Sequence, residues 1–146
     1  MKHTALLTPT VKKLILYRLP LVAWMAAIFA VSSLTPGEIA RAAEPARPLS
    51  SLISDAAAHT FEFGVMAVLV YRLLRSYEVR AAPYLWAGVL AITALYGASD
   101  ELHQSFVPGR DPSLLDVASD AAGAVIGLLA AEVGARTWRR FRPGRR

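Results

Sequence analysis

Three short stretches of the sequence carry ionisable side chains at spacings that could support chemistry. His59 and Glu62 are three residues apart, and Asp116 and Asp120 are four apart, so on a helix each pair would share one face. The stretch between them supplies carboxylates, an imidazole, an amide and a guanidinium, on Asp100, Glu101, His103, Gln104 and Arg110. Brought together, these stretches would form one polar site. We expect four catalytic candidates, His59, Glu62, Asp100 and Glu101, and four substrate-binding candidates, Gln104, Arg110, Asp116 and Asp120.

Two kinds of chemistry fit these residue types. The His59–Glu62 pair and residues 100–103 could form a metal or acid–base site, since carboxylates and imidazoles suit a hard or borderline divalent cation. Alternatively, Arg110 and His59 could bind an anionic head group or phosphate. The His-Glu-x-x-His motif is absent, so the sequence assigns neither a metal nor a cofactor. No nearby serine lies in a nucleophile elbow, and the absence of cysteine excludes thiolate nucleophiles.

Four long apolar blocks must position these residues. They cover residues 14–33, 56–74, 81–99 and 117–135. Each approaches the roughly 20 residues that a helix needs to cross about 30 Å of hydrocarbon. The blocks are rich in Ala and Leu and show no alternation of period two, which argues against strands. The sequence therefore predicts an all-α bundle of four transmembrane helices over residues 14–135, between an N-terminal segment (1–13) and a basic tail (136–146).

Composition supports a membrane protein over a soluble one. The 146 residues are 55% hydrophobic and 18% charged, whereas soluble domains are about 45–50% apolar and about 25% charged. The third block contains no charged residue, and a soluble helix of that length would show water a polar face. A cleaved leader is the alternative for the first block, but about ten polar or turn-forming residues separate that block from the cleavage-like site near residue 42.

The basic residues predict the orientation of the bundle. The net charge is +5, and the chain has 16 Lys and Arg residues. Most of them lie near the start of the first block, in the link near residues 72–80 or after the fourth block. The exceptions are Arg41, Arg47 and Arg110. By the positive-inside rule, both termini and that link are cytoplasmic, and the loops at residues 34–54 and 101–115 face outward. The candidate site then lies at the outer helix ends. The basic tail fits contact with lipid head groups, so we expect no nucleic-acid partner.

Smaller features of the fourth block have structural explanations. Gly123 and Gly127 form a G-x-x-x-G pair, which favours close helix packing within the bundle or, in a homo-oligomer, between chains. Asp116 is placed to cap the start of this helix. Glu78 and Glu132 are expected to pair with arginines at the cytoplasmic side.

These polar blocks resemble the VanZ-like family of small bacterial membrane proteins, over about residues 20–135. Residues 96–110, YGASDELHQSFVPGR, closely resemble the family signature Asp-Glu-x-x-Gln-x-Phe-x-Pro-x-Arg. Residues 55–64, DAAAHTFEFG, resemble its Asp-Lys-x-x-His…Glu-Tyr pattern, and residues 113–127, SLLDVASDAAGAVIG, match a third block in which the family usually has Asn at position 120. The family usually has a Lys three residues before the histidine and an aromatic residue directly after it. This sequence has Ala56 and Thr60 at those two positions.

The resemblance implies a multi-pass protein of the bacterial cytoplasmic (inner) membrane, in a family whose named member is associated with resistance to the glycopeptide teicoplanin. We therefore expect a protein that acts at the outer face of that membrane on a lipid-linked or anionic envelope component. Two alternatives remain: an enzyme of lipid-phosphate or lipid-carrier chemistry using the His/Glu/Asp/Arg site, and a non-catalytic partner subunit. Apart from the bilayer, the expected partners are that envelope component and a second copy bound through Gly123 and Gly127.

Overall fold

The computed structural model describes residues 8–43 and 55–141, of which 85% are helical and none forms a strand. Four helical stretches in this part of the chain are long and apolar enough to cross a membrane: Pro9–Ser32, Asp55–Ser76, Ala82–Gln104 and Leu114–Phe141. This confirms the predicted all-α bundle with four membrane-spanning helices. The helices run past the apolar blocks, so that several polar candidates lie within helices and not in loops.

The first spanning stretch is assembled from three consecutive segments, α1 (Pro9–Lys13), η1 (Leu14–Arg18) and α2 (Leu19–Ser32). The Thr8 side chain accepts from the Val11 backbone N–H at 3.3 Å and caps the start. In the middle, Pro20 has no N–H to offer to the preceding turn. The backbone there widens into the π-turn η1, in which the Leu19 N–H bonds the Leu14 carbonyl.

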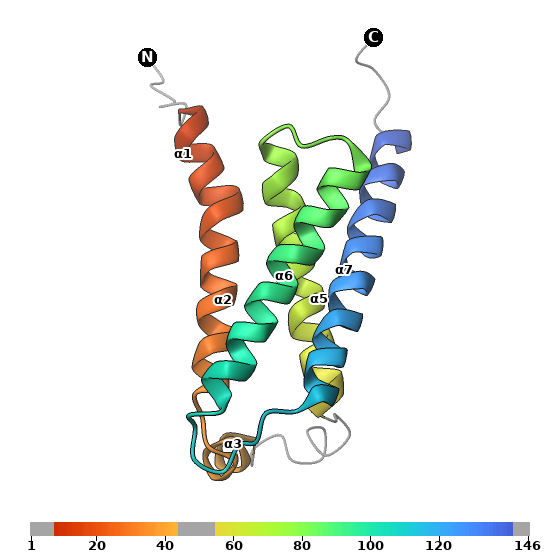
Figure 1. Cartoon of the computed structure of the whole chain (residues 1–146). Helices are drawn as coiled ribbons and strands as arrows, with labels where there is room; N and C mark the ends of the chain where they lie inside the picture. Colours follow the sequence, from red (N-terminus) through yellow and green to blue (C-terminus); the bar gives the residue numbers. More distant parts are fainter. Residues whose placement is uncertain (1–7, 44–54, 142–146) are drawn as a thin grey trace, which may run out of the picture.

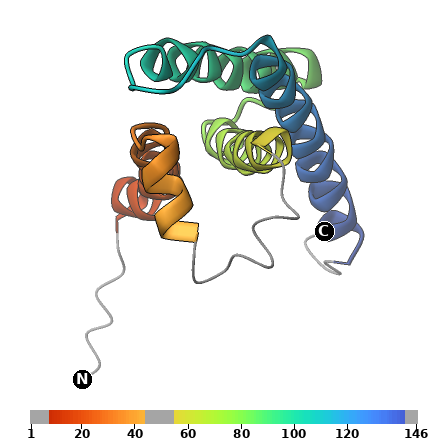
Figure 2. The same cartoon turned by 90° about the horizontal axis from the view of Figure 1, so that it is seen from below.

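Helix α5 (Asp55–Ser76) is the central helix of the bundle and contacts α2, α6 (Ala82–Gln104) and α7 (Leu114–Phe141). Figure 1 shows the start of α1, the end of α7 and the α5–α6 turn at one end, which we call the basic end. At the other end, the polar end, α2 and α6 finish, α5 and α7 begin, and α3 (Pro36–Ala43) lies below the end of α2. Viewed from that end, α2 and α7 flank α5, and α6 covers a third side (Figure 2).

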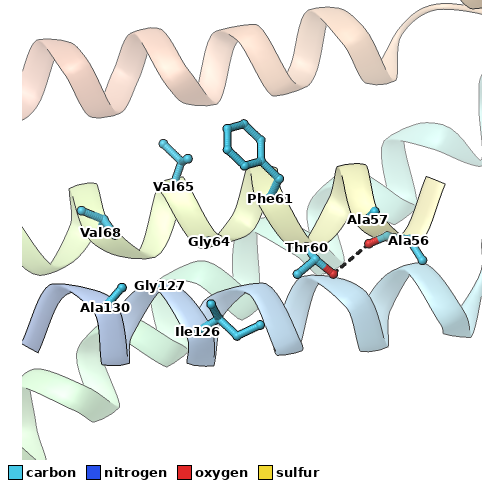
Figure 3. Close-up of a pocket in the computed structure, with 10 residues that line it drawn as sticks. All are labelled: Ala56, Ala57, Thr60, Phe61, Gly64, Val65, Val68, Ile126, Gly127 and Ala130. Atoms are coloured by element: carbon cyan, nitrogen blue, oxygen red, sulfur yellow. Dashed lines mark hydrogen bonds between the residues drawn. The ribbon is translucent and has the colours of Figure 1, made fainter. Parts of the chain in front are cut away.

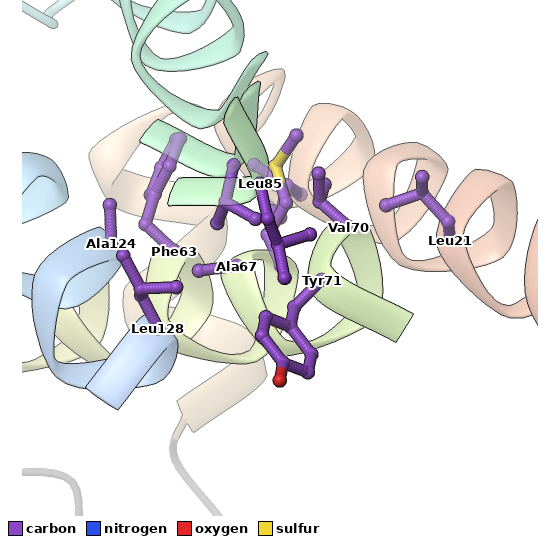
Figure 4. Packing of buried hydrophobic residues seen from close by; sticks show 11 residues of the cluster. Leu21, Phe63, Ala67, Val70, Tyr71, Leu85, Ala124 and Leu128 are labelled. Atoms are coloured by element: carbon purple, nitrogen blue, oxygen red, sulfur yellow. The ribbon is translucent and has the colours of Figure 1, made fainter. Parts of the chain in front are cut away.

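The apolar core lies along α5, where it meets the other three spanning helices. Its fully buried side chains come mainly from α5 and α6, and are Phe63, Met66, Val70, Leu85 and Val89 (Figure 4). The outer surfaces of the helices carry large apolar side chains, among them Val22, Phe29, Ile126 and Leu129, each about half exposed. A lipid environment accounts for this surface, because a water-facing helix would place polar residues there.

The contact between α5 and α7 is the closest in the bundle and depends on glycine. A Cβ atom at Gly123 would lie 2.3 Å from the carbonyl oxygen of Thr60, and one at Gly127 would lie 2.1 Å from that of Gly64. These distances are too short for a carbon atom, so only the hydrogen of a glycine fits at positions 123 and 127. Within this chain, the G-x-x-x-G pair therefore serves packing inside the bundle, and its use between two copies stays a prediction.

At the basic end, carboxylates pair with arginines as expected from the sequence. Glu132 accepts from Arg136 at 3.0 Å and from the Tyr71 hydroxyl at 2.9 Å, which joins α7 to α5. Glu78 pairs with Arg80 in the α5–α6 turn and has a φ of 63°. These ion pairs lie far from the polar end and have a structural explanation.

Helix α3 starts with a capping box. The Glu38 carboxylate accepts from the Thr35 backbone N–H at 2.8 Å and from its hydroxyl at 2.7 Å, and the Glu38 N–H points back to the Thr35 hydroxyl at 3.4 Å. Pro36 occupies the first helical position, where its missing N–H costs no hydrogen bond. These hydrogen bonds from Thr35 lower the pKa of Glu38 below its ordinary value of 4.5.

Gly127→Ala should lower the stability of the bundle, because the new methyl group overlaps the α5 backbone. Overpacking of this kind costs about 1–3 kcal/mol or more. Thermal unfolding in detergent, followed by circular dichroism, measures the effect. Gly134→Ala is the matched control, since a Cβ there meets no described atom within 4 Å. Equal melting temperatures for the two variants would contradict the packing described here.

The capping box predicts a pH dependence for α3. The pKa of Glu38 is depressed in the folded protein. Its contribution to the stability of α3 is therefore fully present at a pH above the ordinary pKa of 4.5, and is lost as the pH falls through the depressed pKa. An NMR titration of the Glu38 carboxyl carbon should give a pKa below 4.5. Thr35→Ala should move that pKa upward, and Thr35→Ser should not. A pKa that Thr35→Ala leaves unchanged would exclude the Thr35 hydroxyl as a cause of the depression and leave the backbone N–H of residue 35.

Candidate functional site

The polar end of the bundle contains a buried ion pair between two helices. Nδ1 of His59, on the second turn of α5, lies 2.9 Å from Oδ1 of Asp120 on α7. Both side chains are nearly inaccessible, with 7% and 4% of their residue surface exposed. The helix geometry explains the meeting, because Gly123 lies one turn after Asp120 and lets α7 approach α5 at Thr60, the neighbour of His59. The pair therefore forms beside one of the two close contacts between the backbones of α5 and α7.

Glu101 lies beside this pair on the last turn of α6. Its Oε2 accepts the backbone N–H of Ser113 at 3.0 Å, which ties α6 to the start of α7. Its Oε1 and the Oδ2 of Asp120 are buried and have no hydrogen-bond partner in the part of the chain that the structure describes. His59, Glu101 and Asp120 each offer one ligand atom, and these three atoms lie within 4.8 Å of one another. This set of donors could hold a metal ion.

A second network joins α2, α6 and the following loop through Asp100. Oδ2 of Asp100 accepts from the Ser32 hydroxyl at 3.0 Å and from Nε2 of Gln104 at 2.8 Å. Oε1 of Gln104 in turn accepts from Nη1 of Arg110 at 3.0 Å. Since each member fixes the next, Asp100 holds the end of α2 against α6 and orients Arg110 through Gln104. Nearby, Ser33 bonds His103 at 2.9 Å.

Gly97 leaves space for the carboxylate of Asp120. A Cβ atom on Gly97 would lie 2.9 Å from Oδ2 of Asp120 and 3.2 Å from a ring carbon of Phe63. Because Glu101 follows Gly97 by one turn of α6, the same helix face supplies both the space and the second carboxylate. Sequence reasoning gave Gly97 no role, since nothing in the local pattern shows which side chain will approach it.

A pocket of about 470 Å³ opens at the polar end, next to these networks. His59, Glu62, Gln104, Arg110 and Asp116 line it. Two further carboxylates, Asp55 and Asp111, also line it, and apolar side chains complete the wall from the end of α2, from α3 and from α5: Val31, Pro36, Ile39, Ala40 and Ala58. The pocket therefore places one guanidinium and several carboxylates beside apolar surface.

A separate groove of about 660 Å³ runs along the outside of α5 and α7 (Figure 3). It is almost wholly apolar and includes Ala56, Phe61, Val65 and Ile126. Such a groove on the surface of a spanning helix pair suits an acyl chain of the surrounding lipid.

All eight residues predicted for the site lie at the polar end. Five of them line the pocket, and the other three, Asp100, Glu101 and Asp120, are buried beside it. Their individual roles stay predictions. One local prediction is wrong: Asp116 is not the cap of α7. The Ser113 hydroxyl accepts from the N–H groups of Leu115 and Asp116 at 3.2 and 3.4 Å, because the helix begins at Leu114 and places Asp116 within its first turn.

Comparison with known families agrees with this arrangement. The model of a family described as VanZ/LLP1 matches residues 14–134, which include the second and third spanning helices, most of the first and fourth, and the polar end. The chain belongs to the VanZ/LLP1 family. No curated protein and no solved structure gives a significant match. Family membership and the four apolar helices together indicate a multi-pass membrane protein of the VanZ/LLP1 type.

The two departures from the VanZ-like pattern lie on α5 where it faces α7. The Thr60 hydroxyl donates to the Ala56 carbonyl at 2.8 Å and to that of Ser119 at 3.3 Å, so a short side chain fits at this crossing. Ala56 lies in the apolar groove, where a lysine would add a charge. In the pocket at the polar end, Arg110 is the one Lys or Arg among the described lining residues.

Gln104→Leu should destabilise the polar end, because it removes the shared partner of Asp100 and Arg110. Leaving a buried polar group unsatisfied costs about 1–3 kcal/mol. The free energy of unfolding in detergent measures this loss. Ser105→Ala serves as the control: its hydroxyl bonds only the Leu102 carbonyl in the described structure, so the change should stay within about 0.5 kcal/mol. Equal stabilities for the two variants would show that the Asp100 network contributes little.

Proposed function

We propose that this VanZ-like protein acts at the outer face of the bacterial inner membrane on a lipid-linked, anionic component of the cell envelope. The observation that carries the proposal is the pocket at the polar end, where Arg110 lies with His59 between the ends of the spanning helices. The positive-inside rule supports the orientation, because the arginines of α7 gather at the opposite end. The polar end then opens to the cell exterior.

The head-group end of such a ligand would bind at Arg110. A guanidinium recognises phosphate or carboxylate through paired N–H groups, provided that it is held in one orientation. Gln104 supplies that orientation through its 3.0 Å hydrogen bond to Nη1, and Gln104 is itself held by Asp100. Arg110 is only half-buried, so it is accessible from the pocket.

The apolar part of the pocket wall supports a lipid-linked ligand over a free anion. Val31 and Ile39 lie on different helices and both add apolar surface to the wall. Ligand sites commonly combine an apolar lining with a few polar groups that fix orientation. An anion attached to a hydrocarbon chain matches both parts. An effect on teicoplanin susceptibility, as in the family's named member, would follow if the bound component is part of the envelope that this antibiotic meets.

An enzyme of lipid-phosphate chemistry is the second candidate, and one observation favours it. The buried pairing of His59 with Asp120 resembles the way a catalytic imidazole is oriented by a carboxylate. In this alternative, His59 is the acid–base group and Asp120 orients it. Turnover of lipid-linked phosphates by the purified protein, lost in His59→Ala, would distinguish this candidate from simple binding.

The test of the proposal is complementation of a deletion strain, scored by the envelope phenotype and by teicoplanin susceptibility. Arg110→Ala should restore little of the phenotype, because a hydrogen bond to a charged group is worth about 1.5–3 kcal/mol, or at least tenfold in affinity. His59→Ala should fail as well. The matched control is Arg41→Ala on α3, which removes the same charge at the same end but lies outside the pocket. Full restoration by Arg110→Ala at wild-type protein levels would refute the proposal.

A further inference from the structure

We propose that His59, Glu101 and Asp120 form a binding site for one divalent transition-metal cation. The three residues come from α5, α6 and α7, so an ion bound there would join three of the four spanning helices. The proposal rests on their geometry and burial, and it holds whether or not the protein acts on a lipid-linked component.

The positions of the donor atoms support coordination. One atom from each residue lies within 4.8 Å of the others. Two ligands of a tetrahedral zinc ion, each at about 2.0–2.2 Å from the metal, are about 3.4 Å apart. The three atoms are close enough for one ion to lie among them, and the ends of the side chains would move closer together on binding it.

The second argument is that two carboxylate oxygens in this cluster are buried without a partner. Glu101 and Asp120 are 6% and 4% exposed, yet Oε1 of the first and Oδ2 of the second accept no hydrogen bond within the described residues. A buried carboxylate oxygen that is neither paired nor hydrogen-bonded is costly. In contrast, the other oxygen of each carboxylate is bonded, to Ser113 N–H and to His59. A cation would satisfy the two that remain.

The charges in the cluster also favour a cation. The two carboxylates can carry two negative charges, and one imidazole can offset only one of them. Arg110 bonds Gln104 and belongs to the neighbouring network. One divalent ion bound to a neutral imidazole would balance both carboxylates. The donor set of one nitrogen and two oxygens suits Zn²⁺ or Mn²⁺ and differs from the all-oxygen shells of Mg²⁺ or Ca²⁺.

The position of the site gives the ion access to a ligand. His59 belongs both to the triad and to the wall of the pocket, whereas Glu101 and Asp120 lie behind that wall. Three protein ligands leave at least one coordination position open, which is the arrangement of metal sites that bind a further oxygen donor. An oxygen of the pocket's occupant, or of water, could fill that position.

The experiment is a metal titration of the purified full-length protein in detergent, after treatment with a chelator. Binding of Mn²⁺ alone is followed by electron paramagnetic resonance, and binding of Zn²⁺ alone by calorimetry. The wild type should bind one ion per chain. Glu101→Gln and Asp120→Asn, which keep size and remove charge, should weaken binding at least tenfold. Glu132→Gln, which changes a carboxylate on α7 outside the triad and the pocket, should remain within twofold of the wild type.

A second readout identifies the ligands directly. Bound Mn²⁺ should show the nuclear coupling of one imidazole nitrogen, and His59→Gln should abolish that coupling. Melting curves of the metal-free variants confirm that each still folds. Failure of the wild type to bind either ion, absence of nitrogen coupling, or unchanged affinity in both Glu101→Gln and Asp120→Asn would overturn the site. The titration contains no lipid and no envelope component, so its outcome is independent of the complementation test of Arg110.

Discussion

Polar side chains at the ends of membrane-spanning helices have little water to bond, so they must find partners on other helices. In this bundle that constraint connects all four spans at one end. Ser32 of α2 bonds Asp100 of α6, and His59 of α5 bonds Asp120 of α7. Glu101 then joins α6 to the backbone at the start of α7. Because removing one partner leaves another polar group buried without a hydrogen bond, these contacts fix how the helices meet at this end.

The polar contacts in turn depend on how closely the backbones approach. Without side chains at Gly123 and Gly127, α7 lies against the carbonyl groups of Thr60 and Gly64. That approach brings Asp120 to His59, and the missing side chain of Gly97 admits the Asp120 carboxylate from the side of α6. Small residues thus set the distances within which the ionisable residues interact. A change in helix packing at this end would therefore also change the distances between the ionisable residues.

The sequence alone was sufficient for the class of fold and for the location of the polar residues, because both follow from hydropathy and from the spacing of charges along single helices. It was not sufficient for the pairing. His59 and Glu62 share a helix face, yet the partner of His59 is Asp120, 61 residues away. The cap of α7 is Ser113 and not Asp116, because the helix starts two residues before that aspartate. Such details depend on how helices rotate and approach in three dimensions, which no local pattern specifies.

The remaining physical question is how a pocket rich in carboxylates can receive an anion. Asp55, Glu62, Asp111 and Asp116 line the pocket together with Arg110, and a single guanidinium does not offset four carboxylates. A divalent ion at the triad would change this balance, because it would neutralise Glu101 and Asp120 just behind the wall and offer an open position near His59. The proposed anionic lipid-linked ligand would then meet less negative charge at the polar end. The cation would mediate between them, and Arg110 would select the orientation of the head group.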